Sequence, residues 1–380
     1  MFNDVIGFIK NLYGERSFIG LHEPIFGGNE RKYVNEAIDS TFVSSVGKFV
    51  DQFESKFAEY IGGGHAIVTS NGTSALHAAL HLLDVGPGDE VITQALTFVA
   101  TANAIAYCGA HPVFLDSDIK NLGLSSLVLE EFLTQNAEVR DGVCRNKNTG
   151  RIIKACVPMH VFGHPVNIEE IVSICGRFHI AVLEDAAESV GSLYKGVHTG
   201  LFGKMGVYSF NGNKIITAGG GGLIVTRDAA LGKRAKHVTT TAKVPHAWDF
   251  YHDEVGFNYR MPNLNAALAL GQLERIPEFV SSKRAIAEEY GAFFDKKGIQ
   301  FVREPADARS NYWLNAIVLD NREQRDLFLR ETNGAGVMTR PIWQLMSELP
   351  MYKNSQFSDL QVARYLRDRI VNLPSSVRIG

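Results

Sequence analysis

The chain has 380 residues, of which 45% are hydrophobic and 21% are charged, and its formal net charge is -3 at pH 7. These values are typical of a globular protein with room for two domains. Acidic and basic residues are interspersed, so the sequence has neither a basic face for nucleic acid nor a polybasic anchor for a membrane. No apolar run reaches the length of a membrane-spanning helix, and we therefore expect no membrane span and no nucleic-acid partner.

The N-terminal segment carries apolar residues at helical spacing between Val5 and Leu12, interrupted by charged residues. It lacks the hydrophobic region of a cleavable signal peptide, so we expect a helix that packs on the surface rather than an export signal. The cysteines lie far apart and form no C-x-x-C motif, which favours reduced thiols in a cytoplasmic protein. They are Cys108, Cys144, Cys156 and Cys175.

Short apolar runs rich in valine and isoleucine follow, and the first five are separated by segments long enough for crossover helices. This alternation predicts an α/β fold with a mostly parallel sheet and helices on both faces. The expected strands lie within residues 65–70, 89–94, 111–116, 154–160, 180–185, 206–211 and 221–227.

Helical patterns dominate beyond Arg227. We therefore expect a large α/β domain over residues 1–241, including the N-terminal helical segment, and a smaller α+β domain over residues 242–380. Residues 140–151 are expected to form a surface loop or a hairpin insertion.

Ligands of an open parallel sheet gather at the carboxyl ends of its strands, and four of these ends carry unusual residues. The segment SNGTSALHAALHLLD places the hydroxyl groups of Thr73 and Ser74 at the start of a helix, where free N–H groups favour a phosphate. An ordinary helix cap by Asn71 or Thr73 is the alternative. A second strand leads to Phe98, whose ring could stack on a planar ligand or could belong to the core.

A third strand ends at Asp185, whose buried carboxylate would need a cation as partner, either a protonated ring nitrogen or a lysine or arginine. Glu188 could face the same way or could be a solvated acid or a cap. The fourth segment, SFNGNKIITAGGGG, contains Ser209 and Lys214, and its glycines follow the lysine instead of preceding it as in a phosphate-binding loop. We expect these glycines to let a bulky ligand or a second chain approach the backbone.

A phosphate seat, a stacking ring, an acid for a ring nitrogen and a lysine that can form an imine are what pyridoxal 5′-phosphate requires. From about Pro24 to Pro374 the sequence resembles the DegT/DnrJ/EryC1 sugar aminotransferases, members of the aspartate aminotransferase superfamily with fold type I. The matching segments are VSSVGKFVDQFESKFAEYIGG, SNGTSALHAAL, DEVITQALTFVATANAI, VPMHVFGHP, EDAAESVGS, YSFNGNKIITAGGGG and GFNYRMPNLNAALALGQL.

The resemblance implies a role for each strand-end residue. Lys214 would bind the cofactor covalently and then move a proton between cofactor and substrate carbons, and Asp185 would keep the pyridine nitrogen protonated. Phe98 would stack on the ring. Glu188, where many relatives have glutamine, would face the phenolic oxygen, and its carboxylate would need to be protonated or reoriented there.

The resemblance also implies where the cofactor's phosphate lies. Thr73, Ser74 and Ser209 match the positions that bind it, and Asn258 matches a residue that reaches it from the neighbouring subunit. The implied assembly is an obligate homodimer with shared active sites. We assign no metal ligands.

The implied reaction moves an amino group from glutamate to a keto group of a nucleotide-linked sugar. Much of the family has a pattern like H-Y-x-P-L-H in its C-terminal domain, whereas this chain has GVMTRPIWQLMSELPMYK, with Arg340, Trp343 and Gln344 in that region. This departure resembles the branch that aminates C4 of UDP-4-keto-6-deoxy-N-acetylglucosamine, which feeds bacillosamine and legionaminic acid synthesis.

Two further residues are candidates for substrate binding. Arg340 would contact the diphosphate or form a surface salt bridge, and His160 would face the sugar or be structural. The alternatives for the whole chain are a dehydratase on the same fold, whose best-known example has histidine in place of the lysine, and a non-catalytic regulator. A regulator would not need the lysine, acid, aromatic ring and phosphate seat together.

Overall fold

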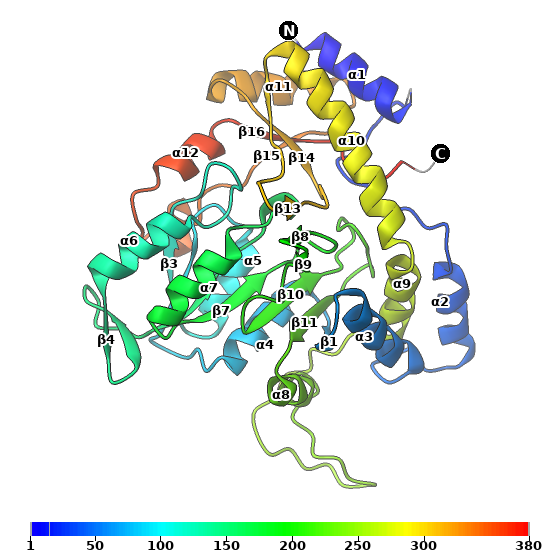
Figure 1. The fold of residues 1–380 in the computed structure, drawn as a ribbon. Helices are drawn as coiled ribbons and strands as arrows, with labels where there is room; N and C mark the ends of the chain where they lie inside the picture. The colour runs from blue at the N-terminus through cyan, green and yellow to red at the C-terminus, as the bar shows by residue number, and fades with distance from the viewer. Residues whose placement is uncertain (1, 15, 379–380) are drawn as a thin grey trace.

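The computed structural model describes residues 2–14 and 16–378. A seven-stranded sheet forms the centre of its larger part, in the order β1-β11-β10-β7-β6-β2-β3 (Figure 1). All of these strands run parallel except β11, which is antiparallel to both of its neighbours. The strands are β1 (His65–Thr69), β2 (Glu90–Gln94), β3 (His111–Leu115), β6 (Ile153–Val157), β7 (Ala181–Asp185), β10 (Met205–Ser209) and β11 (Gly222–Thr226). The predicted strands and the predicted α/β class are thereby confirmed.

Helices cover both faces of this sheet, which explains why most positions of its strands are buried on both faces instead of alternating between buried and exposed. Successive residues of a strand point to opposite faces, so Val182 packs with α6 and α7 while Leu183 packs with α4, α5 and α8. The covering helices are α3 (Lys48–Tyr60), α4 (Gly72–Leu82), α5 (Val99–Tyr107), α6 (Ser126–Asn136), α7 (Ile168–Arg177) and α8 (Ala229–Thr239), while α9 (Asn263–Leu273) packs on α3 and α2 (Glu30–Asp39) packs on α9.

A four-stranded antiparallel sheet in the order β12-β14-β16-β15 forms the smaller part. Its strands are β12 (Gln300–Phe301), β14 (Asn315–Val318), β15 (Arg340–Pro341) and β16 (Ile370–Leu373). The helices beside it are α10 (Ile276–Lys297), α11 (Arg322–Gly334) and α12 (Gln361–Arg367).

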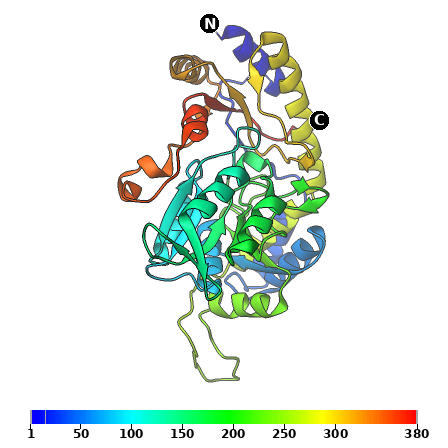
Figure 2. The same cartoon turned by 60° about the vertical axis from the view of Figure 1, so that its left-hand side comes forward.

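The N-terminal helix α1 (Asn3–Tyr13) packs on this smaller part and not on the large sheet, and it lies beside α10 in Figures 1 and 2. Its apolar residues share a core with Phe294 and Phe328, since the stripe that is buried on α1 fits the surface between α10 and α11. Conversely, α9 packs with α2 and α3. By packing, α1 therefore belongs with the C-terminal part and α9 with the large part, whereas a domain boundary after residue 241 would place each helix in the other part.

Two smaller sheets complete the fold. The predicted insertion is a hairpin of β4 (Ala137–Arg140) and β5 (Val143–Asn146), and β13 (Ala308–Arg309), β8 (Leu193–Tyr194) and β9 (Val197–His198) form a three-stranded sheet. Short 3-10 helices span Val161–Gly163, Met346–Glu348 and Pro350–Tyr352. All four cysteines are free thiols.

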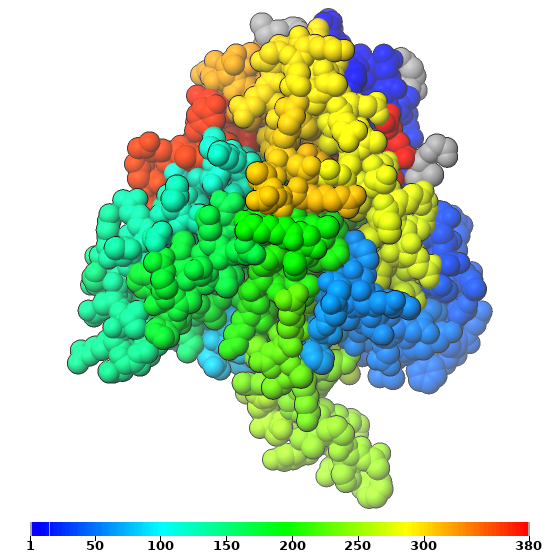
Figure 3. Space-filling model, in the orientation of Figure 1, coloured from blue at the N-terminus to red at the C-terminus, as the bar shows by residue number. Residues whose placement is uncertain are grey.

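Residues 243–256 project from the body next to α8, as the space-filling view shows at its lower end (Figure 3). No helix in the described ranges combines the length and apolar character that crossing a membrane demands.

Candidate active site

A cavity of about 530 Å³ lies where the carboxyl ends of the large sheet meet the C-terminal sheet. The structure brings most of the predicted site residues to its wall, namely Thr73, Phe98, Asp185, Glu188, Ser209, Lys214 and Arg340. Residues from the C-terminal part close the other side, among them Trp313, Trp343 and Asn372.

Lys214 follows strand β10 and is largely buried, with 12% of its side chain exposed. Its Nζ atom lies 3.2 Å from Oε1 of Glu188 and 4.0 Å from the centre of the Trp313 ring. The carboxylate and the face of the ring both favour a cation, and together they compensate the ammonium group for lost water. Lys214 is therefore not an ordinary surface charge.

Trp313 was not predicted as a site residue. It lies far along the chain in SNYWLNAIVL, where the pattern indicates only a buried strand. Its indole Nε1 donates a hydrogen bond of 2.7 Å to the carbonyl oxygen of Asn213, which fixes the ring beside Lys214. Nothing in the local pattern distinguishes this residue from a core aromatic.

Asp185 ends strand β7 and is buried beside the cavity. Its Oδ2 accepts a hydrogen bond of 2.7 Å from the Thr101 hydroxyl, and its Oδ1 accepts one of 3.2 Å from the backbone N–H of Ala187. Burial raises the pKa of Asp185, and the Thr101 hydrogen bond opposes that rise. No ion pair to this carboxylate is found in the described part of the chain, so the position suits a cationic ring nitrogen of a ligand.

Glu188 is buried and is neither a solvated acid nor a helix cap. Its Oε2 accepts a hydrogen bond of 3.0 Å from the backbone N–H of Phe162, and its Oε1 faces Lys214. Burial raises the pKa of Glu188 to about 7, against the opposing charge of Lys214. A carboxyl group with this pKa can be neutral near physiological pH, as glutamine always is.

The start of α4 combines the two functions that the sequence left open. The side chain of Asn71 caps the helix by accepting a 2.8 Å hydrogen bond from the backbone N–H of Ser74, while Thr73 and Ser209 line the cavity. Ser74 does not line it, and its hydroxyl accepts a hydrogen bond from Ser70 instead. The N-terminus of α4 thus lies at the cavity wall, where the helix dipole suits a phosphate.

The four glycines after Lys214 make room mainly for the chain itself. A Cβ atom on Gly222 would lie 2.4 Å from the backbone of Asn71, and one on Gly221 would lie 2.5 Å from the Met261 side chain. Gly219 has a φ of +75°, whereas Gly220 has no close neighbour. We expected these glycines to make room for a bulky ligand or a second chain. At Gly222 the room is instead taken by the turn at Asn71, which begins α4.

Phe98 precedes α5 and is 47% exposed, so its ring is not part of the core. It meets the Trp343 ring edge-on at 6.3 Å, and Trp343 also contacts Phe162 at 5.3 Å. A planar ligand would lie against an exposed aromatic face here.

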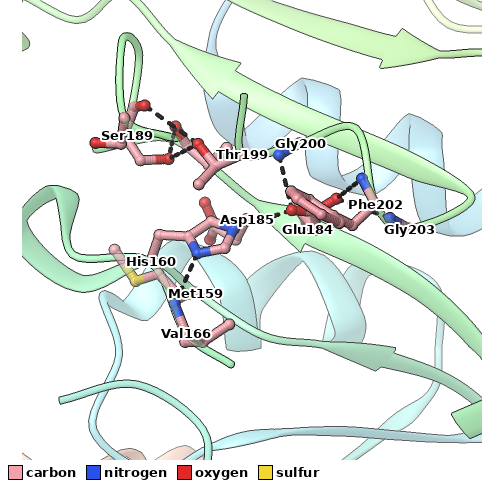
Figure 4. Close-up of polar contacts among 12 residues, drawn as sticks. Met159, His160, Val166, Glu184, Asp185, Ser189, Thr199, Gly200, Phe202 and Gly203 are labelled. Carbon is pink, nitrogen blue, oxygen red and sulfur yellow. Dashed lines mark hydrogen bonds and ion pairs between the residues drawn. The ribbon is translucent and has the colours of Figure 1, made fainter. Parts of the chain in front are cut away.

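His160 is not on the cavity wall, contrary to the expectation that it faces a sugar. The residue is fully buried, and both ring nitrogens are bonded within the protein (Figure 4). Nδ1 accepts a 3.2 Å hydrogen bond from the backbone N–H of Val166, so Nε2 carries the proton that faces Glu184 at 3.1 Å. Glu184 also accepts hydrogen bonds from three backbone N–H groups, those of Gly200, Phe202 and Gly203. These contacts match the structural alternative, because no ring nitrogen is left for a ligand.

Asn258 is exposed and does not line the cavity of its own chain. Its Oδ1 accepts a 3.1 Å hydrogen bond from Arg260. Arg340 lines the cavity and is exposed, and its guanidinium group has no ion pair or hydrogen bond with any residue in the described ranges.

Fold and cavity together define a fold type I aminotransferase that depends on pyridoxal phosphate. The model of the DegT/DnrJ/EryC1/StrS aminotransferase family matches residues 24–380, and the chain belongs to this family. It is therefore an enzyme, a sugar aminotransferase.

Two curated relatives illustrate the likeness. GDP-perosamine synthase of Escherichia coli O157:H7 is 38% identical over 94% of this chain and 93% of its own length. A putative pyridoxal phosphate-dependent aminotransferase of Bacillus subtilis, EpsN, is 37% identical over 89% of this chain and 85% of its own. Among solved structures, the aminotransferase TlmJ from Streptoalloteichus hindustanus superposes with a TM-score of 0.85 at 29% identity, covering 94% of this chain and 93% of that one.

Proposed function

We propose that the enzyme transfers the amino group of L-glutamate to the C4 keto group of a nucleotide-linked keto-deoxy sugar. The observation that carries this proposal is the presence, on one cavity wall, of the largely buried Lys214 and of Asp185, a buried acid that forms no ion pair in the described chain. Bound pyridoxal phosphate supplies the aldehyde and the electron-withdrawing ring. Lys214 then holds and moves the proton at the reacting carbon, and Asp185 holds a proton at the ring nitrogen.

The remaining cavity residues bind and orient the cofactor in this proposal. Thr73, Ser209 and the free N–H groups that begin α4 bind the phosphate, and Phe98 stacks on the ring. Glu188 faces the phenolic oxygen in its neutral form, which its raised pKa makes accessible near pH 7.

The preferred acceptor is UDP-4-keto-6-deoxy-N-acetylglucosamine, and the product is the corresponding 4-amino sugar for bacterial glycan synthesis. The segment around Trp343 supports this choice through its likeness to that branch. A GDP-linked sugar is the second candidate, because GDP-perosamine synthases of two further species are 36% and 35% identical to this chain.

The active unit in this proposal is a homodimer in which Asn258 of one subunit reaches the phosphate bound by the other. The projecting segment next to Asn258 supports a second copy as its partner, because its apolar side chains would otherwise stay in water. Trp248, Phe250, Tyr251 and Val255 are from 62% to 82% exposed.

Incubation of the enzyme with glutamate and a panel of UDP-, GDP- and dTDP-linked 4-keto sugars tests the proposal, with NMR analysis of the products. Glutamate should shift the absorbance spectrum of the bound cofactor. The UDP-sugar should then restore the original spectrum and gain an amino group at C4. Turnover of a GDP-sugar alone would establish the second candidate. A protein that stays colourless with added cofactor would overturn the proposed reaction.

A further inference from the structure

Asn372, on strand β16, is a buried polar residue without a partner on the wall of the active-site cavity. The residue is 3% exposed, and its Nδ2 atom has no hydrogen-bond acceptor among the residues that the structure describes. Such atoms are uncommon, because an unpaired buried donor costs free energy. Of the unpartnered buried side-chain atoms found in the described ranges, this is the one whose residue lines the cavity.

Asn311 shows how a structural asparagine is used in the same region. Its Nδ2 donates hydrogen bonds to the carbonyl oxygens of Glu188 at 3.0 Å and Val190 at 2.9 Å. Its Oδ1 accepts one of 2.8 Å from the backbone N–H of Trp313. Both the nitrogen and the oxygen of the Asn311 carboxamide therefore form hydrogen bonds with the backbone, whereas the amide nitrogen of Asn372 forms none in the described part of the chain.

Arg340 lies directly opposite Asn372 in the antiparallel pair β15–β16. Residues directly opposite each other in such a pair carry their side chains on the same face, and both of these residues line the cavity. The amide of Asn372 is buried in the wall, and the guanidinium group of Arg340 is exposed and free of ion pairs in the described part of the chain. Adjacent strands thus place at the wall of one cavity two side chains whose hydrogen-bond donors no described residue uses.

We propose that Asn372 and Arg340 form one binding site for the paired anionic oxygens of a substrate. Carboxylate and phosphate oxygens accept charge-assisted hydrogen bonds from such donors. In the proposed reaction, on which this inference rests, the group is either a carboxylate of the amino donor or the diphosphate of the sugar nucleotide. Asn372 then acts as a binding residue that decides where the anion lies, while Lys214 acts at the reacting carbon.

Asn372→Asp tests this site, because it keeps the shape of the side chain and replaces the donor by an acceptor that is negatively charged when ionised. One arm titrates the holoenzyme with L-glutamate and follows the cofactor's absorbance. The other arm titrates UDP and GDP and follows tryptophan fluorescence, since Trp313 and Trp343 line the cavity, in a Trp248→Phe background. We expect the dissociation constant in at least one arm to rise by between about tenfold and a hundredfold.

Asn315→Asp is the matched control. Asn315 is also a buried asparagine of this sheet, but it does not line the cavity, and its Nδ2 already donates to Ser375. The dissociation constants of the Asn315→Asp variant for glutamate, UDP and GDP should stay close to those of the wild type. A rise with glutamate alone assigns the site to the carboxylate, and a rise with UDP or GDP alone assigns it to the diphosphate.

Asn372→Leu separates binding from a structural role and serves if the aspartate variant does not fold. Removing an unpaired buried donor should leave the thermal midpoint of the ligand-free protein unchanged or raise it, while weakening the same ligand. A lowered midpoint with unchanged binding in both arms would overturn the inference. Because neither arm needs the keto sugar, this outcome is independent of whether the sugar in the proposed function is correct.

Discussion

Lys214 is held at the residue scale by two interactions of different kinds. Glu188 neutralises its charge at 3.2 Å, and the Trp313 ring lies 4.0 Å from the ammonium group. Both interactions favour a positive charge on this nitrogen inside the cavity. Loss of that charge would leave Glu188 without its cationic partner, which favours the neutral carboxyl group.

Lys214→Ala should abolish covalent cofactor binding and lower turnover by more than about 1,000-fold, because it removes both the nucleophile and the proton carrier. The absorbance of the bound cofactor and the rate of product formation measure the two effects. Circular dichroism should show an unchanged fold, and unchanged turnover would contradict the role assigned to this lysine.

Glu188→Gln should change how stability depends on pH. The pKa of Glu188 is about 7 in the folded protein and ordinarily 4.5, so its contribution to stability is complete below about pH 4.5 and is lost as the pH rises through 7. Linkage predicts a loss of about 1.4 kcal/mol per pH unit between these values, which glutamine cannot show because it does not titrate. The variant should therefore gain stability relative to the wild type as the pH rises.

Urea unfolding of the cofactor-free proteins between pH 5 and 7 measures this difference. We expect the free energy of unfolding of the variant, relative to the wild type, to rise by about 2–3 kcal/mol over that range. Parallel pH profiles for the two proteins would show that burial does not raise the pKa of Glu188.

At the scale of elements, strand β11 and the start of α4 touch backbone to backbone behind the cavity. This contact lets the turn at Asn71 present the helix N-terminus beside Ser209, and it exists because Gly222 has no side chain. The antiparallel strand β11 therefore does more than extend the sheet, since it supports the proposed phosphate seat.

Gly222→Ala should destabilise the protein by about 1–3 kcal/mol, because the added methyl group forces the Asn71 turn away from β11. Affinity for the cofactor should fall with it, and urea unfolding and cofactor titration measure the two effects. Gly220→Ala is the matched control, since its added Cβ would meet nothing closer than 3.9 Å and should cost well under about 1 kcal/mol. Equal effects of the two variants would contradict the close approach at Gly222.

At the scale of the whole molecule, the active-site cavity lies between parts that are distant in sequence. The large sheet supplies Lys214, Asp185 and the start of α4, while the C-terminal part supplies Trp313, Arg340 and Asn372. Helix α1 packs against the core of that C-terminal part, and the Tyr13 hydroxyl donates a 3.0 Å hydrogen bond to the carbonyl oxygen of Pro374, two residues beyond Asn372. The first helix of the chain thus supports the sheet that closes the cavity.

Replacing Trp248 and Phe250 together by serine should weaken the proposed dimer. Exposed aromatic residues dominate the binding energy of many interfaces, so we expect the dimer dissociation constant to rise more than tenfold, or about 1.4 kcal/mol. Sedimentation velocity measures it, and Leu127→Ser, an exposed apolar residue on α6, is the control. A dimer that the double variant leaves unchanged would place the interface elsewhere.

Local patterns in the sequence were enough to predict the central strands and the residues that follow them. Runs such as IAVLED begin with four apolar residues in a row, as is typical of a strand covered on both faces, and the carboxyl ends of parallel strands converge on one edge. Asp185, Phe98 and Lys214 could therefore be identified as neighbours in the cavity without knowledge of the structure. The family likeness rests on the same segments.

The environment of each residue was decided only by the tertiary structure. His160 lies just beyond the end of β6, much as Asp185 lies at the end of β7, yet contacts with Glu184 and Val166 use its whole hydrogen-bonding capacity. Asn372 reaches the cavity from strand β16, and Trp313 reaches it from the segment just before strand β14. The sequence by itself determined the helices and strands and the residue types at the strand ends, because these depend on neighbours along the chain. Which side chains stay free to bind a ligand depends on contacts between distant segments. Only the tertiary structure decided those contacts.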